Sequence, residues 1–334
     1  MAVNNALERD VVVSSRVRLA RNYKDIPFAP AMNREWAQET IRRAADALAR
    51  QRETYQLIRM ENLTNAQRRQ LVEHHLISYD LLKFAELSAA LIGQQDTVSV
   101  MVNEEDHLRI QALLPGMQPE KTAEMVFALD DALGADDNYA FDAQFGFLTS
   151  CPTNVGTGMR ASTMLHLPAL ARVGKLSALL QAISKLGLTV RGIYGEGSEA
   201  QGNLYQLSNQ VTLGRSEEDT LKTLIAATTQ IISYERGARK ALQQHDAALL
   251  EDQLMRSYGE FANARILPVK EFMSRCSDLR LAASLGYVDR DYAFIDALMM
   301  DAQDGSLSVQ LGGEKNEREM DMARAEYVRA KLSE

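Results

Sequence analysis

The sequence predicts a mixed α/β region followed by an all-helical region, with the boundary near residue 238. Strand-like and helix-like segments are interspersed up to about Ser216, after which helical periodicity alone continues to the C-terminus. The 334 residues, of which 46% are hydrophobic and 25% charged, are enough to bury a substantial core. We therefore expect two domains, residues 1–238 and residues 239–334.

The first half of the mixed region is predicted from β-branched runs and helical periodicity. The run VVVSSRVRL at residues 11–19 indicates a strand, and TVSVMVN at residues 97–103 indicates another, which ends in the acidic turn EEDH. Helices are expected at residues 34–52, over most of residues 64–91, and after Pro119.

The second half combines glycine-containing loops with further strands. Residues 149–168 contain a Cys-Pro step and two glycines and are interpreted as a loop that leads into a strand. A helix is expected at residues 175–186, where Gly187 ends it. Strands are expected at residues 188–194 and in the segment LYQLSNQVTL.

Composition limits the class of protein. The net charge of −8 opposes general binding to nucleic acid or to anionic membranes, because any cationic surface must be local. The two cysteines, Cys151 and Cys276, are too few for a disulfide framework and lack the spacing of a structural zinc site. The N-terminus has no apolar signal segment, and no stretch reaches the roughly 18 apolar residues of a membrane span. We expect a cytosolic protein that carries no metal of its own.

Two arginines in the first predicted strand stand two residues apart. Arg16 and Arg18 should leave the same face of the strand about 7 Å apart, with Val13, Val17 and Leu19 on the other face. Two like charges in this arrangement need an anion nearby. A solvated strand face, or one with acidic neighbours, would explain the pair equally well.

Three further arginines lie at the edges of predicted loops or strands. These are Arg109 after NEEDHL, Arg160 after NVGTG, and Arg191 in LTVRG. The planar, permanently charged guanidinium suits phosphate oxygens, and a set of them could neutralise a triphosphate and a phosphoryl group in transfer. The sequence alone does not decide whether they converge.

Two acidic segments and one cysteine are candidates for chemistry. Residues 103–106, NEED, and residues 195–199, GEGSE, could each supply a carboxylate, although surface acids are the default interpretation. A guanidinium acceptor would give them a role, because it is positively charged and must be oriented and deprotonated. Cys151, which precedes Pro152, is either an inert buried thiol or a thiolate favoured by nearby arginines.

Several common motifs are rejected. Gly156, Gly158 and Ala161 fit G-x-G-x-x-A, but no βαβ unit surrounds them and no acidic residue ends a strand at the required distance. The P-loop pattern and the H-R-D and D-F-G motifs of protein kinases do not occur. His74 and His75 have no partner at metal-binding spacing, so a structural role is their default.

Five segments together resemble a known family. SSRVRLAR, HHLIS, NEEDHLRI, FGFLTSCPTNVGTGMRAS and VRGIYGEGSE closely resemble, in order and spacing, the ATP:guanidino phosphotransferases (phosphagen kinases), over residues 10–238. SNQVTLGRSEED and the helical C-terminal region resemble the bacterial protein arginine kinase branch, the McsB type. The resemblance implies an α+β fold: an antiparallel sheet flanked by helices, like that of glutamine synthetase, followed by a small all-α domain.

The resemblance also implies residue roles. Glu105 matches the carboxylate that acts as base, Glu196 matches a second carboxylate that holds the guanidinium, and Cys151 matches a thiol beside the guanidinium. The positions that match ATP-binding residues or their neighbours are Ser14, Ser15, Arg16, Val17, Arg18, His75, Arg109, Arg160, Ala161, Ser162, Thr163, Met164, Arg191, Gly192, Ile193, Tyr194, Gly195 and Glu196.

The implied co-substrate is ATP with Mg²⁺, which is expected to keep much of its water shell. Small-molecule members of the family carry a helical domain before the SSRVR segment, which here begins at Ser14. We therefore expect an open site that admits an arginine side chain of a protein. The alternatives are a kinase for free arginine or another small guanidino compound, and a non-catalytic module that binds arginine or phosphoarginine.

The resemblance further implies partners and regulation. Protein substrates, with a heat-shock repressor among the candidates, a Clp protease system, a zinc-binding activator protein and a second copy of the chain are expected partners. The R-D-x-x-R-A motif that reads phosphoarginine in this branch corresponds to Met320, Asp321, Arg324 and Ala325. Because methionine replaces the leading arginine, we expect weaker recognition of phosphoarginine.

Overall fold

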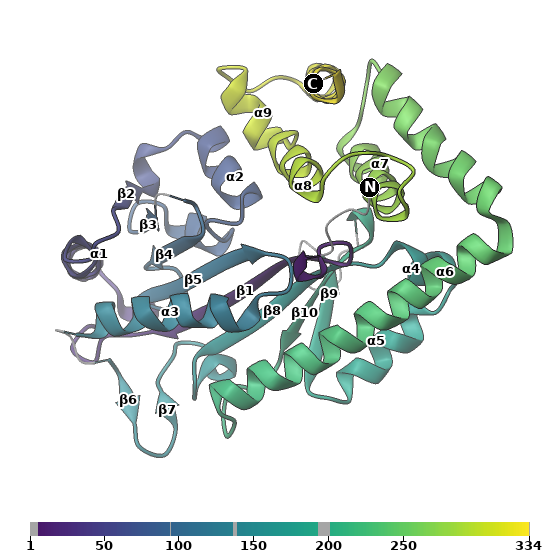
Figure 1. Ribbon diagram of the computed structural model, residues 1–334. Helices are drawn as coiled ribbons and strands as arrows, with labels where there is room; N and C mark the ends of the chain where they lie inside the picture. The colour runs from purple at the N-terminus through teal and green to yellow at the C-terminus, as the bar shows by residue number, and fades with distance from the viewer. Residues whose placement is uncertain (1–5, 94, 136–138, 193–200, 334) are drawn as a thin grey trace.

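The computed structural model describes residues 6–93, 95–135, 139–192 and 201–333 (Figure 1). Within these residues, one eight-stranded sheet runs in the order β2-β3-β4-β5-β1-β8-β10-β9, and all its neighbouring strands are antiparallel. The strands are β1 (Val12–Arg21), β2 (Tyr55–Arg59), β3 (Ala89–Gly93), β4 (Val98–Val102), β5 (Leu108–Pro115), β8 (Met159–His166), β9 (Leu188–Gly192) and β10 (Leu204–Asn209). The antiparallel sheet confirms the fold class implied by the resemblance.

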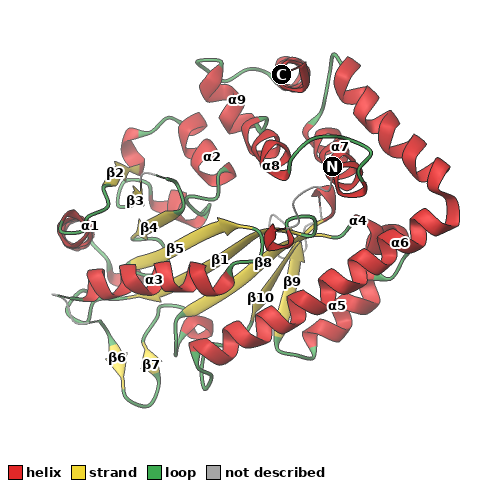
Figure 2. Cartoon of the chain, in the orientation of Figure 1, coloured by secondary structure: helices red, strands yellow, loops and turns green. Residues whose placement is uncertain are grey.

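Helices flank the sheet and make up the C-terminal region (Figure 2). They are α1 (Arg34–Ala49), α2 (Asn65–Glu73), α3 (Pro119–Gly134), α4 (Pro168–Arg172), α5 (Leu176–Ser184), α6 (Glu217–Asn263), α7 (Val269–Leu285), α8 (Tyr292–Asp301), α9 (Asp304–Gln310) and α10 (Glu317–Ser333). A short hairpin of β6 (Phe141–Asp142) and β7 (Gly146–Phe147) pairs outside the main sheet.

One face of the sheet is apolar and carries the main core. Val17 and Leu19 of β1 are fully buried there with Ile110 of β5, against residues of α1, α3, α5 and α6. Helices α3 and α6 lie across this face in Figure 1. Alternation along β1 sends Val17 and Leu19 into this core and Arg16 and Arg18 to the other face.

Among the described residues, helices cover the opposite face at its two ends. At the β3 and β4 end, Met101 and Ile92 pack under α2. At the other end, Leu204 of β10 joins the core of the C-terminal helices, with Met164 of β8 packed against it. A polar strip of sheet therefore lies between two apolar covers, and this strip holds the candidate site.

The C-terminal region begins within one long helix that changes direction. Helix α6 contains a non-helical residue at Asp246 (φ −159°, ψ 89°), whose side chain accepts a hydrogen bond from the backbone N–H of Leu249 at 2.9 Å. Asp246 therefore caps the second part of the helix. The predicted domain division near residue 238 falls within the first part of α6 and stays a prediction.

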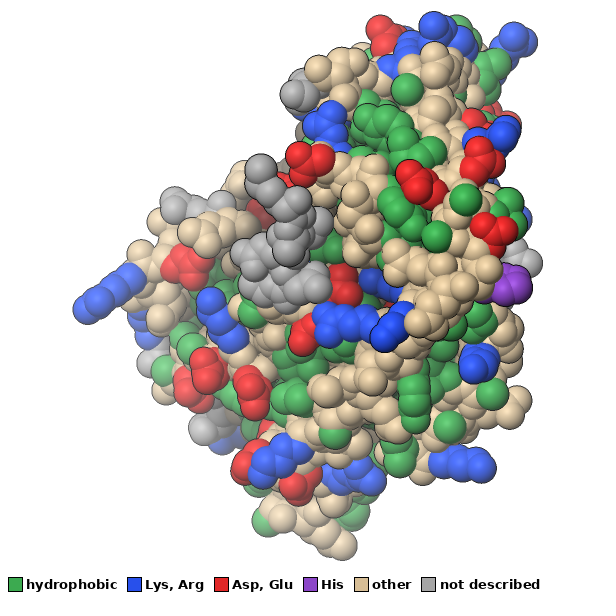
Figure 3. Space-filling model, turned by 45° about the vertical axis from the view of Figure 1, so that its right-hand side comes forward, with side chains coloured by type: hydrophobic (Ala, Val, Ile, Leu, Met, Phe, Trp, Pro, Cys, Tyr) green, Lys and Arg blue, Asp and Glu red, His purple; other side chains and the backbone are tan. Residues whose placement is uncertain are grey.

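The surface carries both signs of charge. On the face shown in Figure 3, Lys and Arg side chains are interspersed with Asp and Glu side chains. No helix in the described part of the chain combines the length and the apolar character that crossing a membrane requires.

Two predictions about elements were wrong. Residues 64–91 are helical only in α2 and in a 3-10 turn at Asp80–Phe84, after which the chain enters β3. Strands β2 and β5 were missed. Five consecutive buried residues in β3, and mostly buried ones in β5, remove the alternation by which a half-buried strand is recognised.

The predicted position of Val13 was also wrong. The register of β1 against β8 shifts between Val12 and Ser14, which marks a β-bulge. Val13 consequently packs against the core of the C-terminal helices, and not with Val17 and Leu19.

Candidate active site

The arginines of β1, β5 and β8 lie on the polar face of the sheet. Arg18 is directly opposite Arg160 of β8, and Ala20, on the same face of β1, is opposite Arg109 of β5. Directly opposed residues of antiparallel strands share a face. Arg16, two residues before Arg18, therefore shares it too.

The register extends this face to the edge strand β9. Arg191 of β9 is opposite Gln206 of β10, and Gln206 is opposite Met164 of β8, which is opposite Ser14 of β1. All five arginines singled out in the sequence thus occupy one face. We call them the arginine band: Arg16, Arg18, Arg109, Arg160 and Arg191.

The centre of the arginine band has a surplus of positive charge. Arg16 donates a hydrogen bond to the neutral side chain of Gln206 at 2.9 Å, and burial together with Arg109 and Arg160 lowers its pKa from 12.5 to about 10. Burial also lowers the pKa of Arg18, and the neighbouring guanidinium groups add to this effect, which Glu104 opposes more weakly. Among the described residues, neither Arg16 nor Arg18 forms an ion pair with a carboxylate. An anion with several oxygens would relieve this repulsion.

A pocket opens over Arg16. The side chains that line it come from β1, β5, β8, β10 and the end of α2: Ser14, Arg16, His75, Leu113, Ser162, Met164 and Gln206. Five of the seven are polar or charged, and they converge from segments far apart in the sequence. The pocket is therefore suited to a polar ligand that adjoins the arginine band.

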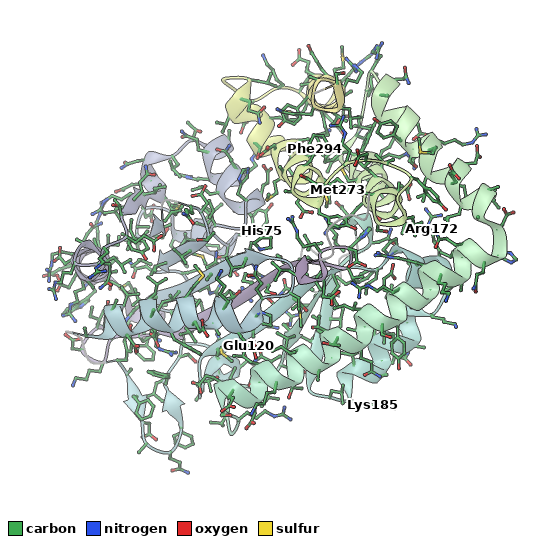
Figure 4. All side chains as sticks on the ribbon, viewed as in Figure 1. His75, Glu120, Arg172, Lys185, Met273 and Phe294 are labelled. Atoms are coloured by element: carbon green, nitrogen blue, oxygen red, sulfur yellow. The ribbon has the colours of Figure 1, made fainter. Side chains whose placement is uncertain are left out.

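His75 enters this pocket from the end of α2 (Figure 4). Its backbone is left-handed (φ 59°), a conformation unusual for a residue with a side chain, and its carbonyl accepts a hydrogen bond from Gln111 Nε2 at 2.7 Å. Burial, with the charge of Arg16, lowers the pKa of His75 from 6.5 to about 4. The imidazole is consequently neutral at pH 7 and can act as a hydrogen-bond partner without adding charge.

The acidic turn before β5 lies at one end of the arginine band. Glu104 is buried, pairs with Arg109 and accepts a hydrogen bond from Ser78 Oγ at 2.6 Å. The side chain of Glu105 is 41% exposed, and its Oε2 lies 3.5 Å from Arg109 Nη2. Partial burial raises the pKa of Glu105, an effect that Arg109 opposes and that Asp106 reinforces. Glu104 is thus held in an ion pair, whereas Glu105 remains accessible.

Cys151 is brought to Glu105 by contacts on both sides of it in the chain. The backbone N–H of Ser150 donates to Asp106 Oδ1 at 2.7 Å, and Asn154 Nδ2 donates to Glu105 Oε2 at 3.5 Å. Cys151 itself is partly exposed. The acidic turn and the cysteine loop, separated by about 45 residues of sequence, therefore form one end of the site.

A match to a protein family agrees with this geometry. A family model described as the ATP:guanido phosphotransferase C-terminal catalytic domain matches residues 37–238. The chain belongs to this family. A second model, described as the protein-arginine kinase McsB C-terminal domain, matches residues 247–334.

Relatives within the family align along nearly the whole chain. A protein named protein-arginine kinase from Caldanaerobacter subterraneus subsp. tengcongensis is 45% identical over 333 residues, which cover 98% of each chain. A protein of the same name from Geobacillus sp. (strain WCH70) is 43% identical over 330 residues, 97% of this chain and 91% of the relative. A third, from Brevibacillus brevis, is 44% identical over 97% of this chain and 92% of its own.

Solved structures share the fold. A lombricine kinase superposes with a TM-score of 0.62 at 24% identity, covering 70% of this chain and 68% of its own. A duplicated taurocyamine kinase from Schistosoma mansoni, with bound transition state analog components, gives a TM-score of 0.62 at 24% identity over 81% of this chain and 40% of its own. At this identity the likeness concerns the guanidino kinase fold alone.

Some of the candidate residues do not present their side chains to the site. Val17 and Ala161 lie in the main core, Thr163 Oγ1 is 3.1 Å from Thr228 of α6, and Ser15 Oγ donates to the carbonyl of Gly116 at 2.8 Å. These side chains are on the apolar face, so at these four positions only the backbone is available to line a nucleotide on the polar face. Ile193, Tyr194, Gly195 and Glu196 lie outside the described residues, whereas Gly192 ends β9.

The family motif at the C-terminus lies in α10. Arg324 is fully buried and donates to the carbonyls of Ala302 and Leu267 at 2.9 and 2.7 Å, to Asp321 at 2.7 Å, and to Asp304. Met320 and Ala325 are buried as well. The guanidinium of Arg324 therefore joins α10 to the turn between α8 and α9 and to the segment before α7.

The contacts of three residues of the site were not anticipated, although Asp106 belongs to the acidic segment 103–106 that the sequence singled out. Gln206 binds Arg16, Gln111 holds the carbonyl of His75, and Asp106 binds the cysteine loop. The alternation of polar residues in LYQLSN could have indicated Gln206, since β10 was expected to be a strand. For Gln111 and Asp106 the sequence offers no such signal, because their partners lie far away in the chain.

Proposed function

We propose that this protein transfers the γ-phosphate of ATP to arginine side chains of other proteins. The observation that carries the proposal is the convergence of five arginines on one sheet face, with an accessible carboxylate, Glu105, at its end. A triphosphate supplies the negative charge that Arg16 and Arg18 lack, and Glu105 and Cys151 stand where an acceptor guanidinium would be attracted and oriented.

The transfer would occur in line. A guanidinium nitrogen of the acceptor forms a bond to the γ-phosphorus, while the bond between that phosphorus and the β–γ bridging oxygen breaks and its electron pair leaves with ADP. The proton lost by the nitrogen passes to the carboxylate of Glu105, whose raised pKa makes it a better base than a fully solvated glutamate. The arginine band stabilises the charge on the transferring phosphoryl group throughout.

The magnesium ion would enter bound to ATP. Mg²⁺ prefers oxygen ligands and keeps several water molecules, so water and the phosphates of ATP can supply most of its ligands. Glu104 is occupied by Arg109 and Ser78, whereas the exposed carboxylate of Glu105 is an oxygen donor of the kind that suits the water shell of the ion. The ion would add to the neutralisation of the phosphates that the arginine band provides.

Protein arginine is the preferred acceptor because relatives at 43–45% identity bear the name protein-arginine kinase, and because the C-terminal helices match the McsB C-terminal domain. The proposal extends to the cytosolic location, a homodimer, and a role in marking proteins for a Clp protease in the stress response. It also includes a zinc-binding activator protein and a heat-shock repressor as partners. Glu196 completes the proposed site as the second carboxylate.

The test is incubation of the protein with Mg·ATP and an unstructured arginine-containing protein, followed by mass spectrometry without acid so that phosphoarginine survives. Phosphoarginine on the protein is expected, with a loss of at least about 100-fold in rate for Glu105→Gln. Glu120→Gln is the control, because Glu120 is an exposed acid on α3, on the opposite side of the sheet (Figure 4). Phosphate on free arginine alone would favour a small-molecule guanidino kinase instead.

A further inference from the structure

The C-terminal helices contact the end of α2, two residues before His75. Glu73, the last residue of α2, accepts hydrogen bonds from the backbone N–H groups of Gly305 and Ser306 at 2.7 and 2.8 Å. It accepts a third from Ser306 Oγ at 3.0 Å. One carboxylate thus satisfies two backbone donors at the start of α9 that have no acceptor within that helix.

This contact is tightly packed. A Cβ added to Gly305 would lie 2.6 Å from Arg69 Cβ and 2.6 Å from the backbone nitrogen of Gln70, so only glycine allows α9 to approach α2 this closely. Ser306 is fully buried in the contact. In Figure 1, α2 and α9 approach each other above the sheet. The contact is therefore a defined junction between two parts of the chain, about 230 residues apart in sequence.

The junction adjoins the residue that enters the pocket. His74 Nε2 lies 3.1 Å from Ser306 Oγ, and the next residue, His75, lines the pocket over Arg16. On the sheet side, Gln111 Nε2 binds the carbonyl of His75. The left-handed backbone of His75 is thus fixed from both sides, by the sheet through Gln111 and by α9 through His74 and Glu73.

The same junction is tied to α10. Arg324 pairs with Asp304, the first residue of α9, and also holds the carbonyl of Ala302 at 2.9 Å. The start of α9 therefore lies between a buried arginine of the C-terminal motif and the carboxylate of Glu73. A continuous series of polar contacts leads from α10 to the pocket.

We propose that Glu73 is a positioning residue for the nucleotide. Its hydrogen bonds to the start of α9 fix His75 in the pocket, and through them the C-terminal helices influence the affinity for ATP. This inference rests on the proposed function of the pocket. Glu73 itself has no contact with the pocket and acts only through His74 and His75. The coupling is carried by the contacts of Glu73 with Gly305 and Ser306.

The test compares ATP affinity among variants of the full chain. Glu73→Ala is expected to raise the dissociation constant and the KM for ATP about three- to tenfold, with the KM for the acceptor protein nearly unchanged. Ser306→Ala, which removes the hydroxyl but keeps the backbone donors, should show a smaller increase in the same direction. Glu73→Gln keeps one acceptor oxygen and should restore part of the affinity.

Glu314→Ala is the matched control. Glu314 pairs with Arg69 of α2 at 2.5 Å, but both side chains are exposed, at 52% and 45%, and the pair does not lead to His75. Its loss should change the ATP affinity less than about twofold. A purely structural role of Glu73 would lower the melting temperature of Glu73→Ala and leave the ATP affinity of the folded protein unchanged, which would overturn the proposal.

A double-mutant cycle tests the route through His75. In a His75→Ala background, Glu73→Ala should raise the dissociation constant for ATP no further, whereas equal effects in both backgrounds would contradict the route. Arg16→Ala separates the two proposals. If Arg16→Ala leaves ATP binding intact, the assignment of the pocket fails; if it abolishes binding while Glu73→Ala and Ser306→Ala do not weaken it, only the positioning role fails.

Discussion

Buried arginines occur in two regions of this protein, and their partners differ. In the C-terminal helices, Arg324 is held by Asp304, Asp321 and two carbonyls, and Arg280 pairs with Asp296 and stacks 4.8 Å from the ring of Tyr292. In the arginine band, Arg16 donates to neutral Gln206 and is repelled by neighbouring guanidinium groups. Arg324 and Arg280 thus have carboxylate partners within the fold, whereas Arg16 pairs with no carboxylate among the described residues.

The difference teaches how to separate a structural arginine from a ligand-binding one. Burial lowers the pKa of both Arg280 and Arg16. At Arg280, Asp296 opposes this effect more strongly than either Arg9 or Arg239 adds to it, whereas at Arg16 the neighbouring charges of Arg109 and Arg160 only add to it. Burial of the guanidinium is therefore not the criterion. The sign of the charges nearest to the guanidinium is the better criterion, because a surplus of like charge is costly until a ligand of opposite charge compensates it.

The largest effect on stability is expected for Arg324→Met. The substitution leaves Asp304, Asp321 and two carbonyls without their donor, and should lower the free energy of unfolding by about 3–5 kcal/mol in urea titrations. The control is Arg256→Met, since Arg256 is 75% exposed in its pair with Asp252 and its loss should leave the free energy of unfolding nearly unchanged. Equal losses for the two variants would contradict the comparison.

Arg18→Met should impair activity and leave stability intact, the opposite of what is expected for Arg324→Met. The kcat/KM for ATP is expected to fall about 100- to 1000-fold, because one guanidinium of the arginine band no longer faces the phosphates. The free energy of unfolding should stay constant or rise by about 1 kcal/mol, because burial and neighbouring arginines already disfavour this charge in the ligand-free fold. A clear loss of stability would mean that Arg18 is structural.

The stabilisation by a bound ATP analogue should differ between the Arg18 and Arg324 variants by about 2–3 kcal/mol. An ATP analogue at a concentration 100 times its dissociation constant should stabilise the protein by about 2.7 kcal/mol. At the same analogue concentration, Arg18→Met should lose most of this stabilisation, and Arg324→Met should retain most of it relative to its own ligand-free state. Thermal unfolding with and without the analogue measures both.

The smallest expected effect is a displacement of the acidic limb in the dependence of kcat/KM on pH. The folded-state pKa of Glu105 is raised, so the carboxylate takes up its proton at a higher pH than an exposed glutamate does. If Glu105 is the base, kcat/KM should fall as the pH falls through this raised pKa, and the profile should level off above it. The residual activity of Glu105→Gln should lack this acidic limb. An unchanged limb would exclude Glu105 as its source.

The sequence predicted the fold class and one shared strand face, but it missed several elements. Arg16 and Arg18 were placed on one strand face by their spacing, and the resemblance pointed to the antiparallel sheet. Strands β3 and β5 were missed because strands buried on both faces lose their alternation. Strand β2 was missed as well. The bulge before Ser14, which redirects Val13, has no local signature.

The sequence by itself determined which side chains are available: arginines that suit phosphate, a carboxylate at Glu105, a thiol at Cys151 and glycine at Gly305. Only the tertiary structure decided their partners. Strand pairing sets Arg18 against Arg160, and helix packing sets Glu73 against Gly305. A local pattern predicts the face that a residue presents, but burial of the whole core decides which segment lies next to it. The positive charges around Arg16 and the acceptors around Arg324 are therefore brought together only on folding.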